Sequence, residues 1–132
     1  MTLQDIAVGA LCAWRENRGG GAPGMQSVLN VLVNRAKARG TTVYEEVLRP
    51  YQFSSMTAPG PEAGIGPNAL NAADWSAYLA ALGLAQQASE DNLPDITGGA
   101  TSYYAASMNP PPAWAASMTR TTEIAGQIFF RV

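Results

Sequence analysis

The stretch that decides the fold is Trp14-Arg15-Glu16-Asn17-Arg18-Gly19-Gly20-Gly21. It closes an apolar segment with one carboxylate, that of Glu16, and continues into a run of three glycines. Glycine ends a helix readily because it adopts the backbone conformations that follow a helix C-terminus. The stretch therefore predicts a helix that ends on a single acid beside a flexible loop.

The residues before this stretch predict a helix from about Thr2 to Glu16. Its apolar residues recur at the spacing of one helical face: Leu3, Ile6, Ala7, Ala10, Leu11 and Trp14. At about 100° per residue, Glu16 falls almost opposite this stripe, on the side of Asp5, Gly9 and Cys12. We therefore expect Glu16 to face either solvent or a second lobe across a cleft.

Three more helices follow from apolar spacing and from start and stop signals. The expected ranges are about Pro23 to Arg39 with Gly40 as the stop, a short helix after the capping-box pattern Thr42-Val43-Tyr44-Glu45 that ends before Pro50, and Asn71 or Ala72 to about Ser89. Residues 57–72 are rich in Pro, Gly, Ala and Asn, which indicates a loop long enough to form a lid or a binding wall.

The character of the chain changes after Gly98-Gly99. A short strand is expected around Ala100 to Tyr104, and two more between Thr119 and Val132, turning at Ala125-Gly126. The sequence thus predicts one domain over residues 1–132. Its fold class is α+β, mainly α, with a small C-terminal β element.

Composition removes several kinds of chemistry. The chain of 132 residues has no histidine and one cysteine, which excludes a Ser-His-Asp triad, a Cys-His pair and histidine metal sites. Proton transfer then falls to carboxylates or tyrosines, and we expect no metal and no cofactor. Charged residues make up 14% and the net charge is −2, so no basic stripe exists for a nucleic acid. A neutral, hydroxyl-rich ligand such as a polysaccharide suits this composition better.

Cys12 cannot form an internal disulfide and is interpreted as a buried thiol. The N-terminal residues include an acid and no basic group, unlike a standard signal peptide. No run of 18 apolar residues occurs, so we expect no membrane span. A substrate outside the cytoplasm would therefore have to be reached by another route.

Glu16 is the candidate catalytic residue. Cleavage of a glycosidic bond needs an acid that protonates the leaving oxygen, and hydrolases add a second carboxylate as base or nucleophile. Such an acid works best when an apolar setting raises its pKa toward neutrality. The alternative interpretation of Glu16 is a solvated carboxylate at a helix end.

Two aromatic groups and a tryptophan could line a sugar-binding cleft, since aromatic faces stack on sugar rings. They are Tyr51 with Phe53, Tyr103 with Tyr104, and Trp114 after a proline turn. Gln52, Ser54 and Thr101 could bind hydroxyl or acetamido groups. For each aromatic residue the alternative is a place in the hydrophobic core.

The ordered motifs resemble the cell-wall hydrolase family typified by the catalytic domain of the spore-cortex lytic enzyme SleB. The matching stretches are Glu16-Asn17-Arg18-Gly19-Gly20, Leu32-Val33-Asn34-Arg35-Ala36, Gln52-Phe53-Ser54, Leu93-Pro94-Asp95-Ile96-Thr97-Gly98-Gly99-Ala100-Thr101-Ser102-Tyr103, Pro112-Ala113-Trp114 and Ile128-Phe129-Phe130-Arg131. Each motif is short, but together and in this order they span nearly the whole chain.

The resemblance implies a lysozyme-like fold that acts on peptidoglycan between N-acetylmuramic acid and N-acetylglucosamine. It also implies a lytic transglycosylase in which Glu16 is the catalytic acid and then the base. The muramic acid C6 hydroxyl would displace the bond and form a 1,6-anhydro sugar, so no second carboxylate is required. The small size resembles a monomeric phage or prophage endolysin released through a holin-type lesion. A bacterial wall-remodelling enzyme is the alternative.

Two positions depart from the family pattern. Gly20 stands where the family has a second acid, and Ser102 stands where it has a histidine. Any hydrogen bond of that histidine would have to come from Ser102, Tyr104 or water. Two other functions stay open. One is a hydrolysing muramidase that uses Asp5, Asp74 or Glu123 as a second carboxylate, and the other is a non-catalytic wall-binding module.

Overall fold

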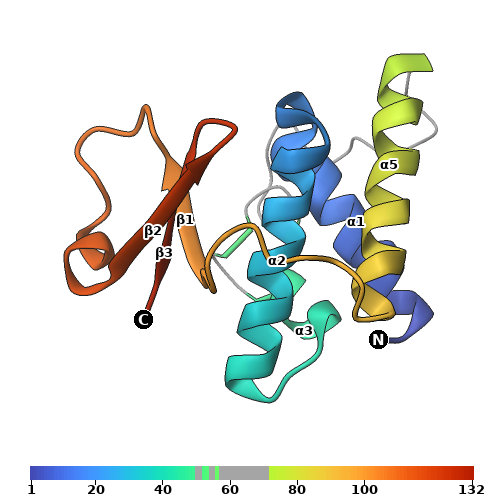
Figure 1. Ribbon diagram of the computed structural model, residues 1–132, viewed down its shortest axis with the longest axis horizontal. Helices are drawn as coiled ribbons and strands as arrows, with labels where there is room; N and C mark the ends of the chain where they lie inside the picture. The colour runs from blue at the N-terminus through green and yellow to red at the C-terminus, as the bar shows by residue number, and fades with distance from the viewer. Residues whose placement is uncertain (50–51, 54–55, 57–71) are drawn as a thin grey trace.

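The structure is a computed structural model that describes residues 1–49, 52–53, 56 and 72–132. Its elements are α1 (Leu3–Asn17), η1 (Arg18–Gly20), α2 (Gly21–Arg39), α3 (Val43–Val47), α5 (Ala72–Ser89), β1 (Ser102–Ala105), η3 (Ala113–Ser117), β2 (Thr119–Ile124) and β3 (Gln127–Arg131). Figure 1 shows the helices grouped in one lobe and the small sheet in another, with α2 between the sheet and the other helices. The mainly α, α+β prediction is confirmed.

Helix α1 begins at a capping box and is tied there to α3. The Thr2 hydroxyl accepts a hydrogen bond from the Asp5 amide at 3.1 Å, and the Asp5 carboxylate accepts one from the Thr2 amide at 2.8 Å. The second carboxylate oxygen of Asp5 accepts from the Tyr44 amide at 2.8 Å. Asp5 is therefore a buried structural group that joins the starts of two helices.

The buried side of α1 differs from the expected stripe. Gly9 and Cys12 are buried, whereas Leu3 is 84% exposed. The reason is that α1 packs against α2, α3 and α5 and is enclosed on several sides. Small residues allow this close approach: a Cβ on Gly9 would lie only 3.2 Å from Cγ1 of Val43. A single apolar stripe cannot describe a helix with three neighbours.

The glycine run forms an ordered turn and not a flexible loop. One turn of 3₁₀ helix, η1, joins α1 to α2, and α2 begins at Gly21, before the expected start at Pro23. Gly21 has φ +66°, a left-handed conformation that favours glycine. The run therefore reverses the chain tightly, so that the end of α1 lies beside the start of α2 (Figure 1).

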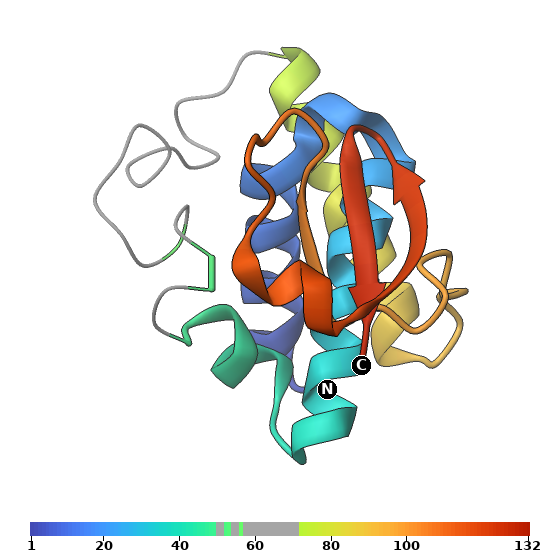
Figure 2. The same ribbon diagram turned by 90° about the vertical axis from the view of Figure 1, so that its left-hand side faces the viewer.

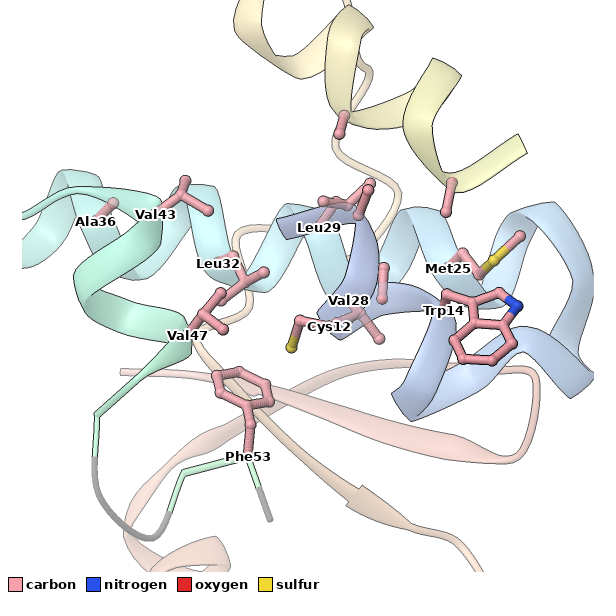
Figure 3. Packing of buried hydrophobic residues seen from close by; sticks show 14 residues of the cluster. Cys12, Trp14, Met25, Val28, Leu29, Leu32, Ala36, Val43, Val47 and Phe53 are labelled. Atoms are coloured by element: carbon pink, nitrogen blue, oxygen red, sulfur yellow. The ribbon is translucent and has the colours of Figure 1, made fainter. Parts of the chain in front are cut away.

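The main core lies between the helices, with α2 at its centre. Met25, Val28, Leu29 and Leu32 of α2 pack against Trp14 and Cys12 of α1, as Figure 3 shows. Helix α5 contributes the small residues Ala81 and Ala85.

Helical spacing predicts a buried stripe of Trp75, Tyr78, Leu79 and Leu82 on α5. This prediction is wrong for Leu79, which is 59% exposed, and for Trp75, which is 39% exposed. The cause is that α5 is almost uniformly apolar, so its spacing does not single out one face.

The three strands form an antiparallel sheet in the order β1-β3-β2. Tyr103 lies opposite Phe129 and Tyr104 opposite Ile128, and the chain turns from β2 into β3 at Ala125-Gly126 as expected. Because side chains alternate along a strand, Tyr103 and Tyr104 point to opposite faces. Tyr103 and Phe129 face the helices, where Phe129 is buried with Val31 of α2.

The loop before β1 is held by amides of α2. Nδ2 of Asn30 donates to the Pro94 carbonyl oxygen at 3.1 Å, and Nδ2 of Asn34 donates to the Ala100 carbonyl oxygen at 2.9 Å. Asp95 accepts hydrogen bonds from Asn34 and from the hydroxyl and amide of Thr97. These bonds fix the start of β1 against α2, and Asp95 acts as a turn residue of the loop.

Candidate active site

Glu16 lies in the last turn of α1, half-buried, and faces the sheet. Its Oε1 accepts a hydrogen bond of 3.0 Å from the hydroxyl of Tyr103 on β1. The two residues are far apart in the chain and meet across the junction of the two lobes. Of the two alternatives for Glu16, solvent or a second lobe, this hydrogen bond favours the second.

Tyr103 is held rigidly enough to orient that carboxyl group. Its ring packs 5.4 Å from the ring of Phe129, measured between centroids. Burial and the nearby Glu16 carboxylate raise the pKa of Tyr103 well above its usual range. The phenol therefore keeps its proton at neutral pH and acts as a hydrogen-bond donor to Glu16.

Cys12 lies one helical turn before Glu16 and is fully buried. Burial and the charge of Glu16 raise the pKa of its thiol well above the ordinary value. The thiol therefore stays protonated and forms part of the apolar floor beneath the acid. This placement confirms the interpretation of Cys12 as a buried thiol.

Asp74, the second residue to consider as an acid, lies at the same end of the molecule as Glu16. In Figure 1 the start of α5 and the end of α1 both lie toward the upper side of the helical lobe. The Asp74 carboxylate is 3.8 Å from Nε of Arg18, whose guanidinium carbon lies 4.3 Å from the centre of the Trp14 ring. Of the three carboxylates that the sequence left open, Asp74 is the one that pairs with a residue of the turn after Glu16.

The other two carboxylates have different positions. Asp5 is used at the opposite end of α1 by Thr2 and Tyr44. Glu123 is an exposed residue of β2 and pairs with Arg120 at 3.5 Å. Within the described residues, no group of three or more His, Cys, Asp or Glu side chains comes together as a possible metal site.

Tyr104 and Trp114 belong to an aromatic cluster on the outer face of the sheet, which Figure 2 views from the front. The rings of Tyr104 and Phe130 stack with centroids 5.5 Å apart. Trp114 meets both rings edge-on, at 5.9 Å from Tyr104 and 5.4 Å from Phe130. The two tyrosines of β1 therefore serve different surfaces, and only Tyr103 reaches Glu16.

The Gln52-Phe53-Ser54 motif divides between surface and core. Gln52 is exposed, whereas Phe53 is 1% exposed and lies near Val47 in the core (Figure 3). The expected role of Phe53 as a sugar-stacking ring needs correction, because its faces are covered by protein. Ser54, Tyr51 and residues 57–71 of the expected lid lie outside the described residues.

Thr101 and Ser102 lie at the start of β1, next to Tyr103. The backbone of Thr101 is bonded on both sides: its amide donates to the Phe130 carbonyl at 2.9 Å, and its carbonyl accepts from Nε of Arg35. Sequence reasoning did not single out Arg35. The signal was available, since an arginine in the apolar part of α2 needs a buried partner.

Gly20 leaves no room for the acid that the family pattern has at this position. A Cβ on Gly20 would lie 2.7 Å from Cβ of Ala125 and 2.7 Å from Oδ1 of Asn17. The turn between β2 and β3 therefore packs directly on η1. In this chain the position joins the two lobes and cannot carry a side chain without a shift of its neighbours.

A family model described as Cell Wall Hydrolase matches residues 19–130. The chain belongs to the cell wall hydrolase family. Membership indicates an enzyme that cleaves peptidoglycan. The matched residues begin after Glu16. The role of Glu16 therefore rests on its hydrogen bond with Tyr103 and not on this match.

Two solved structures share the fold of this cell wall hydrolase. One is the catalytic domain of the germination-specific lytic transglycosylase SleB from Bacillus anthracis, with a TM-score of 0.70, 22% identity, and coverage of 99% of this chain and 97% of that one. The other is the catalytic domain of the Bacillus cereus SleB protein, with a TM-score of 0.70, 22% identity, and coverage of 99% and 92%. No curated protein matches the chain. No helix of the described part is long and apolar enough to cross a membrane.

Proposed function

We propose that this cell wall hydrolase is a lytic transglycosylase that cleaves between N-acetylmuramic acid and N-acetylglucosamine, with Glu16 as acid and base. The observation that carries the proposal is the 3.0 Å hydrogen bond from a protonated Tyr103 to a half-buried Glu16 at the junction of the lobes. The SleB domain of Bacillus anthracis, which shares the fold, is described as a lytic transglycosylase.

The reaction needs one carboxyl group in two protonation states. Protonated Glu16 gives its proton to the glycosidic oxygen, and the bond between that oxygen and C1 of muramic acid breaks. The resulting Glu16 carboxylate then takes the proton of the muramic acid C6 hydroxyl as its oxygen bonds to C1. The products are a 1,6-anhydro sugar and a free N-acetylglucosamine hydroxyl, and no water is consumed.

Tyr103 fits this cycle as a positioning residue. Its hydroxyl donates to Glu16 and keeps its own proton because its pKa is raised. A fixed donor holds the carboxyl plane in one orientation while the other oxygen faces the substrate. Proton transfer then occurs at one oxygen of Glu16, and the hydrogen bond to Tyr103 occupies the other.

Hydrolysis is the second candidate function, and the position of Asp74 favours it. The Asp74 carboxylate lies 3.8 Å from Nε of Arg18, and Arg18 is two residues beyond Glu16 in the chain. A carboxylate there could activate a water molecule on the far side of the sugar, as inverting glycosidases do. The products would then have reducing ends in place of anhydro ends.

Product analysis separates the two reactions. Purified peptidoglycan is digested with the wild-type protein, with Glu16→Gln and with Asp74→Asn, and the muropeptides are identified by mass spectrometry. We expect anhydro-muropeptides, one water lighter than reducing products, from the wild type and from Asp74→Asn and none from Glu16→Gln. Reducing products that disappear in Asp74→Asn would establish hydrolysis instead. Binding without release by any of the three proteins would leave a wall-binding module.

A further inference from the structure

Arg35 is a buried cation whose hydrogen bonds are incomplete. The residue is 7% exposed, its Nε donates to the Thr101 carbonyl, and its guanidinium carbon lies 5.1 Å from the centre of the Phe53 ring. Its Nη1 is buried and has no hydrogen-bond partner among the described residues. An unsatisfied donor of a buried charged group is costly, so this site lacks an acceptor.

A groove of about 280 Å³ lies beside this guanidinium, between the C-terminal half of α2 and the ends of the strands. It is lined by Arg35, Ala38, Arg39, Thr101, Ser102, Met118 and Val132. In Figure 2 the C-terminus lies in front of this half of α2. The side chains that line the groove include two arginines and no acid.

The carboxylates nearest in the chain are bound elsewhere. Glu46 accepts from Arg39 at 2.7 Å and from Arg49 at 2.8 Å, and the side chain of Arg39 is 44% exposed. The carbonyl oxygen of Val132 accepts from Nη1 of Arg131 at 3.2 Å. These groups therefore do not supply an acceptor for Arg35.

We infer that this groove binds a carboxylate of the peptide stem attached to muramic acid, which makes peptide-bearing glycan the preferred substrate. The inference rests on the proposed function of the Glu16 site. The sugars of the strand carry neutral hydroxyl and acetamido groups, whereas the stem carries free carboxylates. Arginine side chains recognise such groups through paired hydrogen bonds.

The position of the groove along β1 suits this ligand. Thr101 and Ser102 directly precede Tyr103, which holds Glu16. A strand advances about 3.3 Å per residue, so the groove starts roughly 3–7 Å of backbone away from Tyr103. An extended stem of two or three residues spans about 7–10 Å and can reach from the cleaved muramic acid to the groove.

Ser102 provides the matched variant. The family pattern that the sequence resembles has a histidine at this position, and the smaller serine leaves the space that the groove occupies. Ser102→His places a ring in that space and leaves both arginines in place. Arg39→Gln removes one positive charge and keeps the space open. Each variant is first checked by thermal unfolding, so that loss of fold is recognised.

The kinetic test compares intact peptidoglycan with glycan strands whose stems have been removed by an amidase. We expect Ser102→His and Arg39→Gln each to raise KM about tenfold on intact strands, with kcat unchanged and with no change on stripped strands. Equal KM values for wild type and variants on intact strands would overturn the inference. Stripped strands have lost the peptide stem and retain only the lactyl carboxylate. An equal rise of KM on both substrates would therefore show that the stem is not what the variants affect, and would overturn the inference as well.

A binding test keeps this inference separate from the cleavage reaction. Glu16→Gln protein is titrated with an alanyl-D-glutamate dipeptide with free carboxylates and with its diamide, followed by NMR. The dipeptide should shift the resonances of Thr101 and Ser102 and the diamide should not; identical responses would overturn the inference. If the wild-type protein cleaves neither kind of strand while the dipeptide still binds, the proposed cleavage reaction is wrong. Carboxylate binding in the groove is then still supported.

Discussion

Among single residues, the proposed reaction depends most on the pair of Glu16 and Tyr103. The apolar spacing places Glu16 on the side of the helix opposite the apolar stripe. In the structure that side faces the sheet, where Tyr103 lies. The hydroxyl of Tyr103 supplies the hydrogen bond, and Cys12 supplies apolar surroundings one turn away. Both groups keep their protons at neutral pH because their pKa values are raised. Of the three groups, Glu16 is the one to which the proposed reaction assigns proton transfer.

Tyr103→Phe tests the role of this hydrogen bond. The substitution keeps the ring that packs on Phe129 and removes the donor to Glu16. A hydrogen bond to a charged group contributes about 1.5–3 kcal/mol, so we expect kcat/KM to fall about tenfold or more. Tyr44→Phe on α3 is the control and should match the wild type. An unchanged rate in Tyr103→Phe would remove the positioning role.

Gly20 allows a stability test at the contact between the lobes. Gly20→Ala should lower the free energy of unfolding by about 1–3 kcal/mol, because its Cβ would lie 2.7 Å from that of Ala125. Gly19→Ala is the matched control, since a Cβ there meets nothing within 4 Å. Urea unfolding of both variants measures the difference. Equal stabilities would show that η1 and the strand turn do not pack as described.

At the element scale, the short helix α3 needs more than its own residues to be stable, since five residues are too few for an isolated helix. Thr42 caps it by accepting from the Glu45 amide at 3.1 Å. Glu46 is fully buried and binds the hydroxyl of Thr41 and the guanidinium groups of Arg39 and Arg49. This cluster fixes α3 against the end of α2.

The Glu46 cluster predicts a loss of stability in acid. Its hydrogen bonds from Arg49 and Thr41 and the charges of the arginines outweigh burial, and they lower the pKa of Glu46 from 4.5 to about 2. A lowered pKa in the folded state gives stability that is complete above about pH 4.5 and is lost as the pH falls toward 2. Urea unfolding between pH 7 and pH 2 should show this decline.

Glu46→Gln should weaken that pH dependence and reduce stability at pH 7. We expect a loss of about 1.5–3 kcal/mol, because a charged acceptor of three hydrogen-bonding groups is replaced by a neutral amide. Glu45→Gln is the control, since Glu45 is exposed at the start of the same helix. The same acid profile in Glu46→Gln as in the wild type would show that other carboxylates are responsible.

At the scale of the whole molecule, most elements could be predicted from the sequence. The helix starting after Thr42 and the strand turn at Ala125-Gly126 depend on local signals, namely a cap and a glycine turn, and both lie where expected. The start of α5 at Ala72 and its end at Ser89 follow from apolar composition and the breakers around it. Local chemistry determines these features, so a single sequence is enough to find them.

Contacts between distant segments could not be predicted in the same way. The bonds from Asn34 to Asp95 and Ala100, and from Arg35 to Thr101, join α2 to a loop more than 60 positions away. Phe53 and Leu79 were assigned to the wrong environments, since an apolar residue fits a core or a ligand surface equally well. The candidate acid was found because composition left few alternatives, whereas its partner, Tyr103, was expected to bind substrate.

The most direct test of the central claim is digestion of peptidoglycan in water enriched in oxygen-18, with mass spectrometry of the released fragments. The claim is that Glu16 moves the protons while the muramic acid C6 oxygen bonds to C1 and displaces the glycosidic oxygen, so that no water is consumed. We predict anhydro fragments with no oxygen-18 from the wild type and no fragments from Glu16→Gln. Fragments that carry one oxygen-18 at a reducing end, or release that continues in Glu16→Gln, would contradict the account.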